Sequence, residues 1–191
     1  MTQAGRLIVL SGPSGVGKTS IVKEVVPRTG AIYSVSATTR PPRAGEVDGR
    51  DYHFVDRKRF EQMIAGGDLL EWAEVFGRLY GTPAGPVGAA LESGRTIVLD
   101  IDVQGALAVH RKMPQATFIL ILPPGREELR RRLGLRGSED AAALARRLAA
   151  ARKEISTARQ SGVYNHEVVN DRLEEAVQRV VAIIRKESPD T

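Results

Sequence analysis

One short stretch near the N-terminus constrains the fold of this chain more than any other feature. Residues 12–19 read Gly-Pro-Ser-Gly-Val-Gly-Lys-Thr and match the pattern G-x-x-x-x-G-K-[S/T]. The apolar run 7–10 before them is typical of a buried parallel strand, and residues 18–26 indicate a helix that ends at Pro27. Glycines here let successive backbone N–H groups point at one anion, and the helix adds its positive N-terminal end. The stretch therefore predicts a phosphate-binding loop (P-loop) within an α/β fold.

This loop is the predicted nucleotide-binding site, because the expected strand and helix flank it as the chemistry requires, although GTPases, ATPases and kinases share the motif. Lys18 would reach the β- and γ-phosphates, and the Thr19 hydroxyl would bind magnesium. A glycine-rich turn that matches by chance is the alternative, and the flanking elements argue against it. The residues assigned to ATP binding are Gly12, Pro13, Ser14, Gly15, Val16, Gly17, Lys18, Thr19 and Ser20.

Two aspartates follow the apolar run 96–99 and could complete the metal site. A carboxylate at such a strand end, here Asp100 or Asp102, can support the hydration shell of a nucleotide-bound magnesium ion. The alternative is a pair of aspartates that only start a turn, and the preceding strand favours the functional interpretation. Thr19 and Asp102 are the predicted magnesium residues, binding directly or through water.

Length, composition and charge fit a single soluble enzyme domain. The chain has 191 residues, 42% of them hydrophobic and none of them cysteine, so disulfides and thiolate metal sites are excluded. No stretch approaches the length of a membrane span or has the form of a signal peptide, so we expect a cytoplasmic protein that binds no membrane. The net charge of +5 fits a solvated basic surface, a nucleic-acid binder or a protein that gathers several phosphates.

Alternation of strands and helices predicts the fold class: α/β, with a three-layer P-loop core around a parallel sheet. The section from 34 to about 90 differs from the rest of the chain, since residues 35–55 are polar and rich in turn signals, and we interpret this section as an inserted subdomain. The predicted strands are 7–10, 69–75, 96–99, 116–122 and 168–169; the predicted helices are 18–26, 60–64, 104–111, 127–133, 140–161 and 173–186.

The insertion carries groups suited to a phosphorylated acceptor. Arg40 and Arg43 lie three apart around two prolines and would form a pre-organised fork for a phosphate. Tyr52 and Tyr80 could donate hydroxyl groups to the same oxygens, although half-buried ring packing is an equal alternative for each. Glu71 stands in an otherwise apolar strand, so its carboxylate is either exposed or buried for a purpose.

A guanine edge would match such groups. It presents donors at N1 and N2, which a carboxylate such as Glu71 can accept, and an acceptor at O6, which a hydroxyl can serve. Ser36 and Thr82 supply hydroxyls in the same part of the sequence.

Five segments of the chain resemble the bacterial guanylate kinases, P-loop kinases of nucleoside monophosphates. They are GPSGVGKT at 12–19, SVSATTRPPRAGEVDGRDYHFV at 34–55, LLEWAEVFGRLYGT at 69–82, IVLDIDVQGA at 97–106 and VVNDRLEEA at 168–176. The resemblance implies magnesium-assisted, in-line transfer of a phosphoryl group from ATP to GMP. It also implies a P-loop core at 1–33 and 84–191, with a mobile lid at about 126–150, and a GMP-binding subdomain at 34–83.

The resemblance also assigns the acceptor residues. It implies that Arg40, Arg43, Tyr52 and Tyr80 bind the GMP phosphate, that Ser36, Glu71 and Thr82 recognise guanine, and that Glu46, Asp100 and Asp102 complete the site around the acceptor and the magnesium ion. Two positions depart from the family pattern: Ala37 stands where His or Ser is common, and Leu79 where a polar or aromatic residue often stands.

An arginine-rich segment follows the third core strand. Its arginines at 126, 130 and 131 are interpreted as a solvated basic face. By resemblance, Arg132, Arg136 and Arg147 are lid residues that would join Lys18 and Arg43 in catalysis, and the loop 134–137 suits a segment that moves. Asn170 resembles a family position beside the adenine of ATP, with a turn cap formed together with Asp171 as the alternative.

Three other functions remain as alternatives at this stage. The first is a catalytically inactive guanylate-kinase-like binding module, and the second is a kinase for another small phosphorylated acceptor. A nucleic-acid binder is the third, and an aromatic content of 5% argues against it. The expected partners are ATP and GMP, with dGMP left open, and the expected state is a monomer or a small homo-oligomer.

Overall fold

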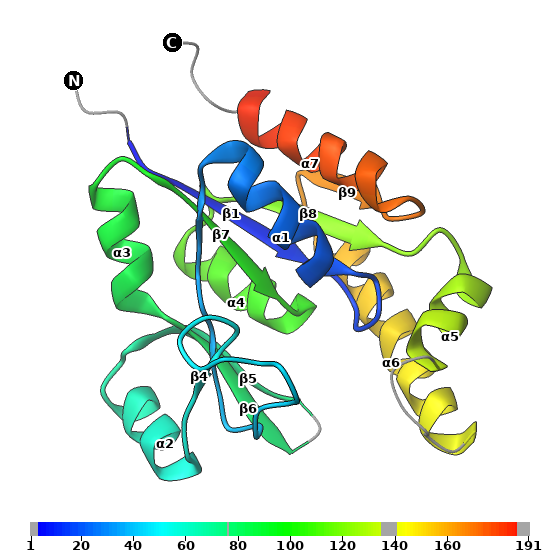
Figure 1. The fold of residues 1–191 in the computed structure, drawn as a ribbon, viewed down its shortest axis with the longest axis horizontal. Helices are drawn as coiled ribbons and strands as arrows, with labels where there is room; N and C mark the ends of the chain where they lie inside the picture. The colour runs from blue at the N-terminus through cyan, green and yellow to red at the C-terminus, as the bar shows by residue number, and fades with distance from the viewer. Residues whose placement is uncertain (1–3, 76, 135–140, 187–191) are drawn as a thin grey trace.

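The structure is a computed structural model that describes residues 4–75, 77–134 and 141–186. Strands and helices alternate along most of the chain (Figure 1). In order they are β1 (Arg6–Ser11), α1 (Lys18–Thr29), β2 (Ile32–Tyr33), β3 (Ala37–Thr38), β4 (His53–Phe54), α2 (Arg57–Ala65), β5 (Leu69–Val75), β6 (Arg78–Pro83), α3 (Ala84–Glu92), β7 (Thr96–Ile101), α4 (Val103–Lys112), β8 (Thr117–Leu122), α5 (Arg126–Gly134), α6 (Ala141–Gln160), β9 (His166–Val169) and α7 (Leu173–Lys186).

Within the described residues, the central sheet has five parallel strands in the order β2-β7-β1-β8-β9. Helices α1 and α7 cover one face, and α3, α4 and α6 cover the other (Figure 1). Because successive strand residues point to opposite faces, Ile8 and Leu10 pack under α1 and α7 while Leu7 and Val9 pack under α3 and α4. The predicted three-layer α/β class with a parallel sheet is confirmed.

A second sheet of four strands, in the order β4-β3-β6-β5, lies to one side of the first. Its core is small: Phe60 of α2 is fully buried and packs with Ala37, Leu69 and Leu79. The two departures from the family pattern, Ala37 and Leu79, are therefore apolar residues inside this core, and neither side chain faces the polar site described below.

The structure differs from the sequence-based prediction at two element ends. Helix α1 does not end at Pro27 but continues to Thr29. A proline disturbs the carbonyl four residues before it, which here belongs to exposed Lys23, and the Thr29 hydroxyl bonds the Val25 carbonyl at 2.8 Å. Strand β7 runs two residues further than expected, so Asp100 lies inside the strand and Asp102 directly follows it.

Most other predicted elements are confirmed with shifts of a few residues. Strand β5 and helix α7 have the expected bounds, whereas α2 begins three residues earlier because Asp56 accepts the Arg59 N–H and caps it. The predicted loop 134–137 falls almost wholly outside the described residues. None of the helices in the described ranges combines the length and apolar character that a membrane span requires.

Candidate active site

The site lies where the parallel strands of the central sheet end. Strand β1 runs into the P-loop, β7 is followed by Asp102, and β9 is followed by Asn170. Because all strands of this sheet are parallel, these three carboxyl ends meet at one edge. The edge faces the second sheet, which carries the residues of the insertion (Figure 1).

Hydrogen bonds from Lys18 and from Asn170, which directly follows β9, hold the P-loop in shape. Lys18 Nζ donates to the carbonyl oxygens of Gly12 at 2.7 Å and Pro13 at 3.3 Å. The Asn170 side-chain amide donates to the Val16 carbonyl at 2.7 Å. Gly17 has φ of 91°, and a Cβ there would lie 2.5 Å from Asn170 Nδ2, so only glycine fits.

Oxygen donors suited to a magnesium ion lie at the start of α1. Thr19 Oγ1 donates to Asp100 Oδ2 at 2.7 Å, and Asp102 lines the same pocket while its Oδ1 caps α4 by accepting the Gly105 N–H. Among the described residues no group of three or more His, Cys, Asp or Glu side chains could cage a metal. Hydroxyl and carboxylate oxygens in this number suit Mg²⁺, which takes most of its other ligands from nucleotide phosphates and water.

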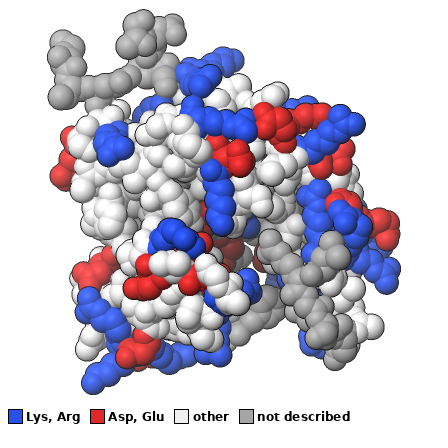
Figure 2. Space-filling model, viewed as in Figure 1, with Lys and Arg blue, Asp and Glu red and all other residues white. Residues whose placement is uncertain are grey.

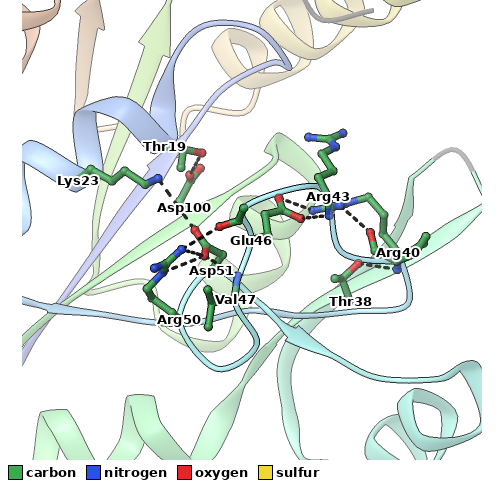
Figure 3. A network of polar contacts seen from close by, with 12 residues as sticks. Thr19, Lys23, Thr38, Arg40, Arg43, Glu46, Val47, Arg50, Asp51 and Asp100 are labelled. Carbon is green, nitrogen blue, oxygen red and sulfur yellow. Dashed lines mark hydrogen bonds and ion pairs between the residues drawn. The ribbon is translucent and has the colours of Figure 1, made fainter.

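The loop 40–51 of the insertion forms a polar network (Figure 3). Arg40 donates to Glu46 Oε1 at 2.8 Å, and the backbone N–H of Arg43 donates to Glu46 Oε2 at 2.7 Å. The hydrogen bond from Arg40 holds the pKa of Glu46 below its usual range. The Arg43 guanidinium points away from Glu46 (Figure 3) and lines the cleft described below. Glu46 therefore orders the loop, and Arg43 presents its charge outward.

Two tyrosines stand beside the Arg40 side chain. The Tyr52 ring lies 6.1 Å from the Tyr80 ring in an edge-to-face arrangement, and the Arg40 guanidinium lies 5.3 Å from the centre of Tyr52. Burial raises the pKa of Tyr52 to about 12, so its hydroxyl remains a donor at neutral pH. The half-buried ring packing is therefore observed for both tyrosines, and donation of their hydroxyls to a phosphate stays a prediction.

Glu71 is buried on β5 and has a polar neighbour on β6. Glu71 is only 6% exposed to solvent. The Thr82 hydroxyl donates a hydrogen bond to Glu71 Oε1 at 2.6 Å. Burial raises the pKa of this carboxyl to about 7. Strand alternation turns Glu71 toward the pocket and leaves the adjacent Trp72 47% exposed, so the buried alternative for Glu71 is the observed one.

A cleft brings the two halves of the site together (Figure 2). Figure 2 shows it as a hollow near the middle of the face, with Lys and Arg side chains around it. Among the described residues, Lys23 of α1 and Asp51 form an ion pair across it at 4.0 Å (Figure 3). The predicted site residues that line it are Gly12, Ser14, Gly15, Gly17, Lys18, Thr19, Ser20, Ser36, Arg40, Arg43, Glu46, Tyr52, Glu71, Tyr80, Asp100, Asp102 and Arg147.

The other predicted residues that the structure describes do not line the cleft but contact residues that do or the segments next to them. Pro13 and Val16 offer their carbonyls to Lys18 and Asn170, and fully buried Thr82 supports Glu71. Arg132 donates to Glu128 at 2.7 Å and to the Asn170 carbonyl at 2.9 Å, so its guanidinium joins α5 to the end of β9. Arg136 lies outside the described residues.

Helix α6 adds a residue that the sequence analysis missed. Glu154 lines the same pocket as Lys18 and Asp102, and its buried Oε2 has no hydrogen-bond partner among the described residues. Burial raises the pKa of this carboxyl. Glu154 follows Arg147 by seven positions, two helical turns, so spacing on an otherwise Ala-rich face could have identified it.

A P-loop at the carboxyl edge of a parallel sheet, with a cleft that joins it to a second set of cationic groups, defines a nucleotide-binding protein of the P-loop class. Comparison with known proteins identifies the family. The family model described as Guanylate kinase matches residues 4–187. The chain is 52% identical to the guanylate kinase of Gloeobacter violaceus over 186 residues, 97% of this chain and 89% of that protein.

Two further relatives agree. A guanylate kinase of Thermus thermophilus is 49% identical over 96% of this chain and 82% of its own length. The crystal structure of guanylate kinase from Anaplasma phagocytophilum superposes with a TM-score of 0.80 at 36% identity, covering 99% of this chain and 89% of that one. The chain therefore belongs to the guanylate kinase family, as its sequence motifs predict.

Proposed function

We propose that this chain transfers the γ-phosphoryl group of ATP to GMP and releases ADP and GDP. Family membership supports this activity in general terms. The observation that carries the proposal is that Lys18 of the P-loop and Glu71 of the second sheet line one pocket. A donor nucleotide held at the P-loop and a purine held at Glu71 would therefore place their phosphates in the same cleft.

ATP would occupy the P-loop, residues 12–20, with its adenine toward Asn170. Lys18 would exchange its bonds to the Gly12 and Pro13 carbonyls for bonds to phosphate oxygens. Thr19 and Asp102 would hold magnesium, directly or through water, with Asp100 orienting the Thr19 hydroxyl. When bound, the ion supplies positive charge that offsets the charge on the β- and γ-phosphates.

GMP would lie against the second sheet. Arg40 and Arg43 would bind its phosphate, with the Tyr52 and Tyr80 hydroxyls as further donors and Glu46 holding the arginine loop in shape. Glu71 would accept from guanine N1 and N2 while Thr82 fixes one carboxylate oxygen. Ser36, buried and in the same pocket, would offer its hydroxyl to O6.

The reaction would be an in-line displacement at the γ-phosphorus. An oxygen of the GMP phosphate forms the new P–O bond, and the bond to the β,γ-bridging oxygen breaks with its electron pair leaving on ADP. The attacking oxygen is already largely anionic at neutral pH, so no strong general base is needed. The difficulty is repulsion, since two unit charges about 4 Å apart cost about 4 kcal/mol at an effective dielectric of 20. Lys18, Arg43 and Arg147 would offset it.

We further propose that residues 34–83 act as the GMP-binding subdomain and that about 126–150 act as a lid, on a core formed by 1–33 and 84–191. The separate sheet of β3 to β6 and its own small core support the first part. For the second, the contact of Arg147 Nη2 with Ser14 Oγ at 3.4 Å joins α6 to the P-loop. Arg132 would have to leave its carbonyl partners to reach a phosphate, and Arg136 is assigned by resemblance alone.

Two alternatives differ in what they require of the P-loop and the pocket. A binding module without catalysis has no need for Lys18 and Thr19, and both are present in a complete P-loop. A kinase of another phosphorylated acceptor has no need for a buried carboxylate that matches guanine, and Glu71 is such a carboxylate.

The acceptor assignment is tested by Arg43→Ala, with Arg57→Ala as the matched control. Both arginines are exposed, but Arg57 lies on α2 and pairs with Glu61 away from the cleft. Loss of a charge-assisted contact to phosphate should raise KM for GMP by about ten- to a hundredfold while KM for ATP stays nearly constant. Steady-state kinetics with each substrate varied in turn measure this. Equal losses toward ATP and GMP, or no loss in Arg43→Ala, would contradict the assignment.

A further inference from the structure

The carboxylate of Glu71 is confined by two neighbouring elements. On one side the Thr82 hydroxyl of β6 holds Oε1 at 2.6 Å. On the other side lies the first turn of α4, which packs against β5 and whose Gly105 faces the second oxygen, Oε2. The position of this carboxylate thus depends on how closely the backbone of α4 can approach it.

Gly105 makes this close approach possible. A Cβ built at this position would lie 2.8 Å from Glu71 Oε2 and 3.2 Å from its Cδ. Gly105 has ordinary helical backbone geometry, so no positive φ requires a glycine, and alanine would favour the helix by about 1 kcal/mol. Space for the carboxylate is therefore the physical reason for a glycine here.

Helix α4 cannot relieve such a contact by moving away. The Gly105 N–H donates to Asp102 Oδ1 at 2.7 Å, which caps the helix, and the next residue, Ala106, is fully buried under the central sheet. Lys112 at the other end of α4 donates to the Leu70 carbonyl of β5 at 2.5 Å. An added methyl group would therefore displace the carboxylate and leave the helix in place.

We propose that Gly105 is a positioning residue for base selection: the missing side chain leaves the Glu71 carboxylate where both oxygens can meet the donors of guanine. This inference rests on the proposed function. With a methyl group at residue 105, Oε2 must move while Thr82 still holds Oε1, and acceptance from N1 and N2 together is lost. The arginines and tyrosines assigned to the GMP phosphate are not among the atoms nearest the added Cβ, whose tightest contacts are with Glu71, while Asp102 Oδ1 lies further away at 3.3 Å, so the main effect should fall on the base.

The test compares Gly105→Ala with Gly88→Ala. Gly88 lies inside α3, and a Cβ there meets nothing within 4 Å, so this control makes the same change in a helix with open space. In Gly105→Ala, KM for GMP should rise about ten- to a hundredfold, the preference for GMP over AMP should fall by a similar factor, and KM for ATP should stay unchanged. Gly88→Ala should match the unmodified protein in all three.

A double-mutant cycle separates positioning from a loss of fold. Glu71→Asp withdraws the carboxylate by one methylene, so it should weaken GMP use in the parent but much less when Gly105→Ala is already present. Additive effects of the two changes, or a Gly105→Ala enzyme with lower thermal stability but the parental GMP preference, would overturn the inference. If the parent itself does not phosphorylate GMP, the proposed function fails; if it does and Gly105→Ala keeps its preference, only this inference fails.

Discussion

At the scale of single residues, the ionisation of Glu71 links guanine binding to pH. Burial raises the pKa of this carboxyl to about 7, so below that pH the group is mostly protonated and cannot accept from both guanine donors. GMP affinity should therefore rise as the pH increases through about 7, and GMP binding near that pH should release a proton from Glu71. Calorimetry of GMP binding on both sides of the pKa, in buffers of different ionisation enthalpy, measures both effects.

Glu71→Gln provides the control for this pH dependence. The GMP phosphate also titrates, with a second pKa of about 6, and the amide variant retains that contribution alone. The difference between the two proteins isolates the carboxyl. A parent and a Glu71→Gln variant with the same pH profile would show that Glu71 does not meet the base in its ionised form.

At the scale of elements, Asn170 connects the end of β9 to the P-loop. Its amide donates to the carbonyl of fully buried Val16, so Asn170→Ala would leave that acceptor without a partner and cost about 1–3 kcal/mol of stability. The P-loop should loosen, and affinity should fall as much for inorganic triphosphate as for ATP, while GMP binding changes little. Denaturant unfolding and calorimetry with both ligands measure this.

The same experiment distinguishes a brace from an adenine contact. If Asn170 acts mainly on the adenine, Asn170→Ala should weaken ATP binding and leave inorganic triphosphate binding unchanged. Asn170→Asp is a useful companion, since it keeps the side-chain shape but places an acceptor against the Val16 carbonyl. We expect it to lose at least as much triphosphate affinity as the alanine variant.

Elements with a strong local signal were predictable from the sequence, and elements made by tertiary pairing were not. The apolar runs of β1, β7 and β8 read as buried strands, and the P-loop fixed the start of α1. Strands β2, β3 and β4 have two residues each, which is too short to show the alternation of apolar and polar residues that marks a strand. They form because neighbouring strands pair with them. Helix α3 contains two glycines and a proline, which are signals for turns, so the sequence did not predict a helix there.

At the scale of the whole molecule, each of the two sheets contributes one side of the cleft, so the candidate site requires both sheets. The central sheet supplies the P-loop at its carboxyl edge, and the second sheet supplies the arginine loop and Glu71. Lys23 and Asp51 connect the two sides across the cleft. The cleft is lined by cationic side chains from both sides, among them Lys18 and Arg43, and by carboxylates, so the two phosphate groups would meet among charges of both signs.

The residue types of this site could be predicted from the sequence, but their partners could not. Motif and family resemblance named Arg40, Glu71 and Asn170. The bonds of Arg40 to Glu46 and of Asn170 to Val16, and the approach of Gly105 to Glu71, join residues whose proximity depends on the folded chain. Such contacts follow from packing and carry no local pattern.

The most direct test of the central claim is coupled turnover of the purified chain with ATP and magnesium, offering GMP, AMP, CMP and UMP in turn. We expect ADP formation that depends on GMP, with GDP as the second product and the other three acceptors far less effective. Lys18→Ala should abolish this turnover while leaving GMP binding measurable by calorimetry. Equal turnover with all four nucleotides would contradict the guanine site, and GMP binding without any turnover would identify the chain as a binding module instead of a kinase.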